Sequence, residues 1–83
     1  MIRCAGHELV PKLDAEGYVR ELTGKGIRIL GIEAFVIDGD QIVPQMDLIA
    51  DFSGSVDVQS SLVDALSFLR RDDDRALYFY FTT

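Results

Sequence analysis

The stretch that decides the fold runs from Ile27 to Ser53, with the sequence IRILGIEAFVIDGDQIVPQMDLIADFS. It is rich in β-branched and aromatic residues, which favour strands. Asp38-Gly39-Asp40 interrupts it with a strong hairpin signal. We therefore expect two long antiparallel strands, one on each side of this turn.

Burial predicts the register of these two strands. Two uninterrupted apolar rows should share one side of the sheet: Leu30, Ile32, Ala34 and Val36, and Ile42, Pro44, Met46, Leu48 and Ala50. A two-residue Asp38-Gly39 turn would bring polar residues to the buried side, so we favour a three-residue connection, Ile37-Asp38-Gly39, with Gly39 left-handed. Pro44 cannot donate to a ladder and implies a bulge or an outward position. A bulge there would make the two-residue turn possible again.

Two segments show helical periodicity. In the first, apolar residues recur at i, i+3, i+4 and i+7, at Ala15, Tyr18, Val19 and Leu22. Asp14 can cap this helix, and Gly24 with Gly26 can end it. The second helix repeats the same spacing at Leu62, Ala65, Leu66 and Leu69, with either Asp57 or Ser61 as its cap.

The last segment, Ala76 to Thr83, alternates Leu77, Phe79 and Phe81 with Tyr78, Tyr80 and Thr82, as a strand with two distinct faces does. Whether residues 1–10 form a further strand stays open. We predict one α+β domain over residues 1–83, since so short a chain builds only one core. Two helices should pack on one face of a mainly antiparallel sheet in the order (β)αββαβ, which matches the ferredoxin-like arrangement if the first segment pairs.

Composition excludes several classes of partner. Asp and Glu outnumber Lys and Arg by 14 to 8, giving a net charge of -6 that repels nucleic acid. No apolar run is long enough to cross a membrane, and nothing near Met1 resembles a signal peptide. Cys4 is the single cysteine, so no internal disulfide can form. A cytoplasmic protein without nucleic-acid or membrane partners is the resulting expectation.

No group of residues in the sequence indicates catalysis, a cofactor or a metal. Cys4 and His7 have the spacing of half a metal site, but no other Cys or His completes it. The Asp38-Gly39-Asp40 turn lacks the further ligands of a calcium loop, and Gly24-Lys25-Gly26 lacks the ending of a phosphate loop. We interpret residues 72–74, three aspartates, as a solvated connection. We expect a protein that is not an enzyme.

The side of the sheet opposite the core is the surface most suited to binding. The strand alternation directs outward Ile29, Glu33, Phe35, Ile37, Val43, Asp47, Ile49 and Asp51, with Tyr78 and Tyr80 beside them. An apolar row bordered by carboxylates is typical of an interface. We predict partner-binding residues at Glu33, Phe35, Asp47, Ile49, Asp51, Tyr78 and Tyr80. The alternative is that the amino-terminal segment or a neighbouring subunit covers this face for stability.

The stretches Gly31-Ile32-Glu33-Ala34-Phe35 and Asp47-Leu48-Ile49-Ala50-Asp51-Phe52-Ser53 resemble those of small bacterial proteins, some similar in kind to immunity proteins that neutralise toxins. The resemblance implies an acidic cytoplasmic binder that blocks a basic nuclease toxin, and it assigns no site residue. Two other functions remain open: a structural or regulatory homodimer, and a small-molecule-binding ferredoxin-like module.

Overall fold

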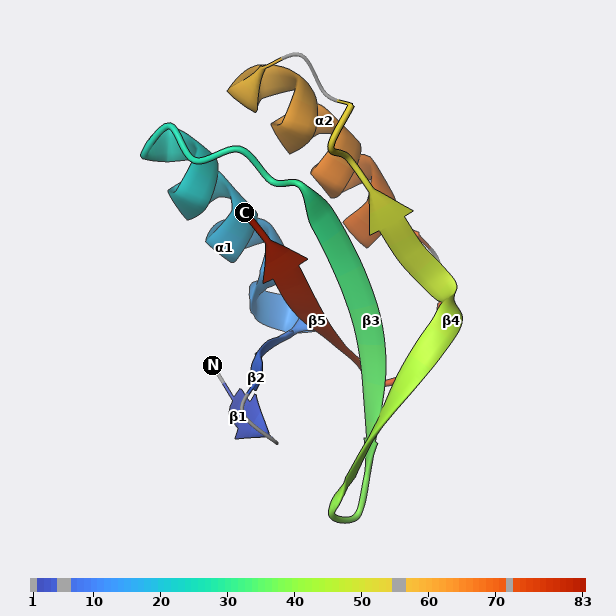
Figure 1. Cartoon of the computed structure of the whole chain (residues 1–83). Helices are drawn as coiled ribbons and strands as arrows, with labels where there is room; N and C mark the ends of the chain where they lie inside the picture. The colour runs from blue at the N-terminus through green and yellow to red at the C-terminus, as the bar shows by residue number, and fades with distance from the viewer. Residues whose placement is uncertain (1, 5–6, 55–56, 72) are drawn as a thin grey trace.

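The computed structural model describes residues 2–4, 7–54, 57–71 and 73–83. The predicted order is confirmed, and the amino-terminal segment, left open by the sequence, adds a hairpin of two short strands (Figure 1). The elements are β1 (Ile2–Cys4), β2 (His7–Pro11), α1 (Lys12–Gly24), β3 (Gly31–Asp38), β4 (Gln41–Asp51), α2 (Val58–Leu69) and β5 (Leu77–Thr82).

One sheet contains all these strands in the order β1-β2-β5-β3-β4, and every neighbouring pair is antiparallel. The interior strands are therefore β2, β5 and β3, while β1 and β4 form the two edges. A ferredoxin-like sheet would place the first strand of the βαββαβ unit in the interior. Among the four strands of this unit, β2 lies at one end of the order β2-β5-β3-β4, so the two folds share the order of elements along the chain but differ in strand order.

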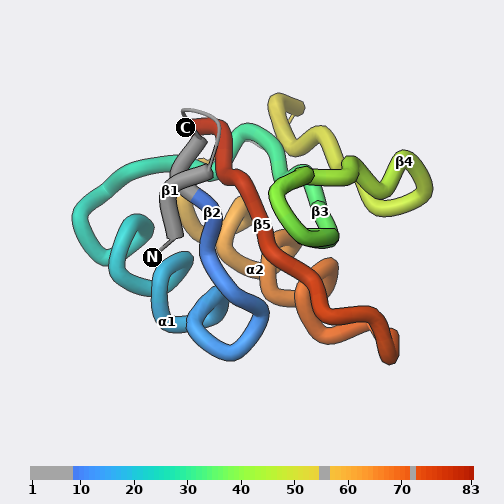
Figure 2. Tube along the Cα trace, turned by 90° about the horizontal axis from the view of Figure 1, so that it is seen from below, coloured from blue at the N-terminus to red at the C-terminus, as the bar shows by residue number. Residues whose placement is uncertain are grey.

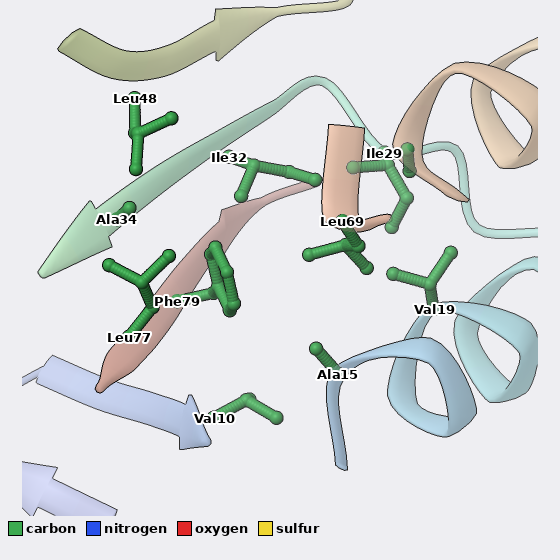
Figure 3. Close-up of a cluster of buried hydrophobic side chains, with 11 residues drawn as sticks. Val10, Ala15, Val19, Ile29, Ile32, Ala34, Leu48, Leu69, Leu77 and Phe79 are labelled. Carbon is green, nitrogen blue, oxygen red and sulfur yellow. The ribbon is translucent and has the colours of Figure 1, made fainter. Parts of the chain in front are cut away.

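Both helices pack against the same face of the sheet, as predicted (Figure 2). The core between the two layers consists of buried apolar side chains from β2, α1, β3, β4, α2 and β5, with Ile29 from the connection before β3 (Figure 3). Phe68 of α2 lies edge-on to Phe79 of β5, with ring centroids 6.3 Å apart. Each fully buried Val, Leu, Ile or Phe contributes about 1.5–3 kcal/mol relative to an exposed one. The rest of the cluster is Val10, Ala15, Val19, Ile29, Ile32, Ala34, Leu48, Ala65, Leu69 and Leu77.

The helix ends differ in part from expectation. Asp14 does not cap α1, because the helix already begins at Lys12, with Pro11 as the residue before it and φ at -59°. Proline suits a helix entry because its fixed φ is already close to the helical value. In α2 the cap is Asp57, whose Oδ1 accepts from the Ser60 N–H at 2.7 Å. Ser61 is instead a fully buried residue inside the helix.

The β3–β4 turn is shorter than predicted. Asp38 pairs with Gln41, so Gly39 and Asp40 alone form the connection, and the expected three-residue Ile37-Asp38-Gly39 loop is wrong. The left-handed conformation expected of Gly39 is confirmed by its φ of 60°. Two-residue hairpin turns need a positive φ at their first position, which glycine adopts without strain.

A large bulge in β4 reconciles this turn with burial of the core. Glu33 pairs with Ile49 and Phe35 with Pro44, so Ala34 alone on β3 faces the four residues Gln45–Leu48 on β4. An odd number of extra residues reverses the alternation of side chains. Leu48 and Ala50 therefore face the helices as predicted, whereas Ile42 and Pro44 face away from them. Val43 was expected on the outer side, but it pairs with Val36 and so lies on the side of the helices. Met46 was expected on the core side, but it is 75% exposed.

Ile29 corrects the predicted alternation at the other end of β3. It was expected on the outer side, yet it is fully buried in the core. The strand begins only at Gly31, so alternation does not extend back to residue 29. The Ile29 N–H donates to Ser61 Oγ at 3.2 Å, and that hydroxyl donates to the Val58 carbonyl at 2.8 Å. This pair of hydrogen bonds fastens the connection before β3 to α2.

Substitution can distinguish the two faces. Ile29→Ala should lower the free energy of unfolding by about 2–5 kcal/mol, because it leaves a cavity in the core. Ile49→Ala, an identical change at a side chain that is 46% exposed, should cost less than about 1 kcal/mol. Urea unfolding of both variants measures the difference. Equal losses would contradict this assignment of the faces.

Candidate binding face of the sheet

The sheet has an outer face, which we define as the side away from the two helices. Directly paired residues share a face, so the strand register decides its members. They are Glu33, Phe35 and Ile37 of β3, Ile42, Pro44, Ile49 and Asp51 of β4, and Tyr78, Tyr80 and Thr82 of β5. Six of the seven residues predicted to bind a partner belong to it. The seventh, Asp47, does not.

Aromatic and aliphatic side chains form the centre of the outer face. Phe35 lies between Tyr78 of β5 and Pro44 of β4, its partners across the two ladders. Such directly opposed side chains have their Cβ atoms about 4.5–5.5 Å apart and shield one another. Phe35, Tyr78 and Tyr80 are accordingly half-buried, whereas Ile49 is exposed. The centre of the face therefore offers a preformed apolar surface on rigid strands.

The side of the outer face nearest β2 is closed. Leu9 alternates with the core residue Val10, so it is directed away from the helices, yet it is fully buried. This agrees in part with the alternative that the protein itself covers the face. The coverage does not reach β4, where Pro44, Ile49 and Asp51 are all exposed. The open part of the outer face thus lies over β3 and β4.

On the three strands β3, β4 and β5, every charge of this face is negative. The strands β3, β4 and β5 contain no Lys or Arg, whereas Glu33 and Asp51 are exposed carboxylates of the outer face. Hydrogen bonds from Ser53, including one from its N–H to Asp51 Oδ1 at 2.9 Å, hold the pKa of Asp51 below its usual value. The Asp51 carboxylate is therefore ionised at neutral pH, and the apolar centre has an acidic border.

Asp47 is engaged elsewhere, in an ion network around Arg75. The Arg75 guanidinium meets Asp47 at two points, with Nη1 to Oδ1 at 3.1 Å and Nη2 to Oδ2 at 3.0 Å. It binds Asp73 through Nε at 2.9 Å and Nη2 at 2.6 Å, and Gln45 Oε1 through Nη1 at 2.9 Å. All five guanidinium donors are used. Asp73 thus belongs to this network and not merely to a solvated turn, while Asp72 lies outside the described residues.

The network braces the bulge of β4. Gln45 and Asp47 lie in the bulge, and Arg75 and Asp73 lie in the connection between α2 and β5. Hydrogen bonds from Arg75 hold the pKa of Asp73 and of Asp47 below their usual values, and the two carboxylates raise the pKa of Arg75. Bidentate guanidinium–carboxylate pairs have a defined geometry, so the network holds β4 in the register that forms the outer face.

The space between helices and sheet offers little room for a ligand. A hollow there, bordered by Leu48, Phe68 and Phe79, holds about 10 Å³, roughly the least that admits one water. Within the described ranges no three Cys, His, Asp or Glu residues gather as metal ligands would. The helices of the described chain are also too short, or too polar, to cross a bilayer.

Sequence reasoning missed three positions that shape or support the outer face. The sequence did not indicate the role of Arg75, because its partners Gln45 and Asp47 lie in a bulge that the hydrophobic periodicity does not show. Gly31 and Thr82 pair across the β3–β5 ladder on the outer face. A glycine inside a strand pattern often marks a close approach of backbones, and this signal was available. A Cβ at Gly31 would lie 3.2 Å from the Ala50 carbonyl oxygen.

The fold and this surface together define a small α+β protein with an open, acidic and partly apolar sheet face. Comparisons with protein-family models, curated proteins and solved structures found no match to the chain. The geometry of the surface is therefore the basis for inferring a function.

Acid should weaken the Arg75 network. The pKa values of Asp47 and Asp73 are lower in the folded chain than the ordinary value of 3.8. Their contribution to stability is thus fully present above about pH 5 and is lost as the pH falls through the lower, folded-state values. The difference in free energy of unfolding between the wild type and Arg75→Gln should be largest near neutral pH and shrink towards pH 2.

Chemical denaturation across this pH range measures that difference. Lys25→Gln provides the control, since Lys25 forms an exposed ion pair with Glu21 at 3.4 Å and with no other carboxylate of the described residues. Its effect on stability should be small at every pH. A gap between the wild type and Arg75→Gln that stays constant from neutral to acid pH would refute the role of the network.

Proposed function

We propose that this chain is a non-enzymatic protein-binding domain whose outer face engages a basic protein partner. The observation that carries the proposal is an open sheet face with Phe35 and Ile49 near its centre, whose charges on β3, β4 and β5 are all negative. Aromatic anchors supply most of the affinity of protein interfaces. Charges at the rim select the partner and speed its encounter.

The sharpest version of the proposal is an immunity or inhibitor role in the cytoplasm. An acidic surface of this kind suits the neutralisation of a basic nuclease, whose own substrate is a polyanion. Support comes from the net charge of -6, from the absence of Lys and Arg on β3, β4 and β5, and from the resemblance of residues 31–35 and 47–53 to proteins of this kind. The lone cysteine is in keeping with a reducing compartment.

The proposal predicts which variants lose binding. The tagged wild-type chain, expressed in its native host, should retain a basic protein. The Phe35→Ser/Ile49→Ser variant should retain at least about tenfold less of that protein, because each anchor residue at an interface contributes about 2 kcal/mol or more to binding. Val63→Ser removes an apolar side chain of α2 that is 57% exposed, and this variant should retain the partner. Quantitative mass spectrometry of the retained proteins measures the loss.

Two controls decide the interpretation. Both variants must unfold at a denaturant concentration close to that of the wild type, because early unfolding of Phe35→Ser/Ile49→Ser would assign these side chains to the core. Sedimentation of the purified chain gives the size of the free protein. A stable dimer that the outer-face variant dissolves would replace the proposal with the homodimer, and retention of the same basic protein by all variants would refute the outer face as the binding surface.

A further inference from the structure

A hollow of about 410 Å³ opens on the outer face over Gly31. Its borders include the carboxylates of Glu33 and Asp51, the side chain of Ile49 and the hydroxyl-bearing Thr82. It therefore combines apolar walls with negative charge. Its volume lies within the range of about 300–1,000 Å³ that is usual for ligand sites, although it is open to solvent.

The hollow exists because one outer-face position has no side chain. Gly31 pairs with Asp51 on β4 and with Thr82 on β5, so these two side chains stand on either side of a gap. Glu33, the next outer-face residue of β3, closes one end of it. Glu33 in turn pairs with Ile49, which places an aliphatic surface beside its carboxylate. A glycine flanked in this way leaves a gap about one side chain wide.

The two carboxylates at the hollow have no basic counterpart among the residues that the structure describes. No Lys or Arg of the described chain forms an ion pair with Glu33 or Asp51. Ser53 donates to the Asp51 carboxylate from its N–H and from its side chain. An ionised carboxylate has about four acceptor positions, so it can accept a further donor. A cation that entered would meet two negative charges beside an apolar wall.

We infer that this hollow receives an arginine or lysine side chain of the protein partner, while an adjacent apolar residue of the partner packs on Phe35 and Tyr78. Basic side chains have an aliphatic stem that packs against apolar surface and a charged head that seeks carboxylates. Ile49 would meet the stem, and Glu33 with Asp51 would meet the head. This inference rests on the proposed function, because it specifies how the same outer face chooses its partner.

A symmetric dimer formed through the outer face is unfavourable at the hollow. In a symmetric dimer each copy presents the same face to the other. The outer-face strands β3, β4 and β5 carry no basic residue, so such a dimer would bring the carboxylates of Glu33 and Asp51 close to those of its partner. Like charges brought together at an interface cost several kcal/mol. Charge complementarity therefore favours a heterologous basic partner.

Selection from a library of short random peptides displayed on phage, with the full-length chain as target, tests the inference. The selected peptides should carry an arginine or lysine next to an aromatic or aliphatic residue. Replacing that arginine by citrulline, or that lysine by norleucine, removes only the charge and should weaken binding at least about tenfold, as is typical when one partner of a partly desolvated ion pair is lost. Calorimetry with the synthetic peptides measures the affinities.

Two matched variants of the protein test whether the carboxylates of the hollow are the ones that bind the basic side chain. Glu33→Gln/Asp51→Asn removes both charges from the hollow with little change in shape, and the amide oxygen at position 51 can still accept the Ser53 N–H. Asp38→Asn/Asp40→Asn removes the same number of charges from the exposed hairpin end. The first variant should lose at least about tenfold in affinity, and the second should lose less than about threefold because only long-range attraction is reduced.

The remaining outcomes are distinguishable. Equal losses of peptide affinity in both variants would show long-range electrostatic attraction without a basic side chain bound in the hollow. That result would overturn the inference. Peptides that lack basic residues, but that lose binding to Phe35→Ser/Ile49→Ser, would overturn the inference and leave the proposed function standing. Failure to enrich any peptide that depends on the outer face would count against both.

Discussion

The in-register pairing of β3 with β5 is the constraint on which the rest of the structure depends. Six consecutive residue pairs join the two strands, from Gly31 with Thr82 to Val36 with Leu77. Each pair assigns two side chains to the same face, so the choice that buries Ile32 with Phe81 necessarily directs Glu33 and Tyr80 outward. Slipping this ladder by one residue would bury a carboxylate and expose Phe79, at a cost of several kcal/mol.

The edge strand β4 satisfies this constraint only with help from Arg75. A tight Gly39–Asp40 turn brings Ile42 and Pro44 outward, whereas the core needs Leu48 inward. The bulge at Gln45–Leu48 reconciles these requirements, and it exposes Met46 as a consequence. An extended bulge has few ladder hydrogen bonds of its own, so side chains have to hold it. Arg75 does so by binding Gln45 and Asp47 from the neighbouring connection.

Helices, the last strand and the fold class were predictable from the sequence because each follows a local period. The stripe at Ala15 and Val19 and the alternation of Leu77 and Phe79 both have the burial that their spacing predicts. The register of β4 was not predictable, because a bulge of unknown length changes the parity of every residue beyond it. Pro44 did indicate a bulge, but not its three extra residues.

The predicted binding face was also correct where the strands are regular and wrong at the bulge. Six of its seven proposed residues lie on the outer face, because they belong to the regular parts of β3, β4 and β5. Asp47 lies within the bulge, where alternation has no meaning, and Ile29 precedes the strand altogether. Strand period thus gave reliable faces only where the ladders are continuous. The Arg75 network and the hollow over Gly31 are products of tertiary structure that a local pattern does not encode.

A partner could bind this sheet either on its face or by pairing an extended strand with one of its edges, which is called strand addition. The two edges of this sheet favour binding on the face. Strand addition needs a straight edge with a continuous row of backbone groups. The bulge divides β4 into Gln41–Pro44 and Ile49–Asp51, and Pro44 has no N–H to offer. The opposite edge is β1, which is only three residues long. A partner that paired with either edge would form few backbone hydrogen bonds, whereas the rigid outer face presents aromatic surface and carboxylates together.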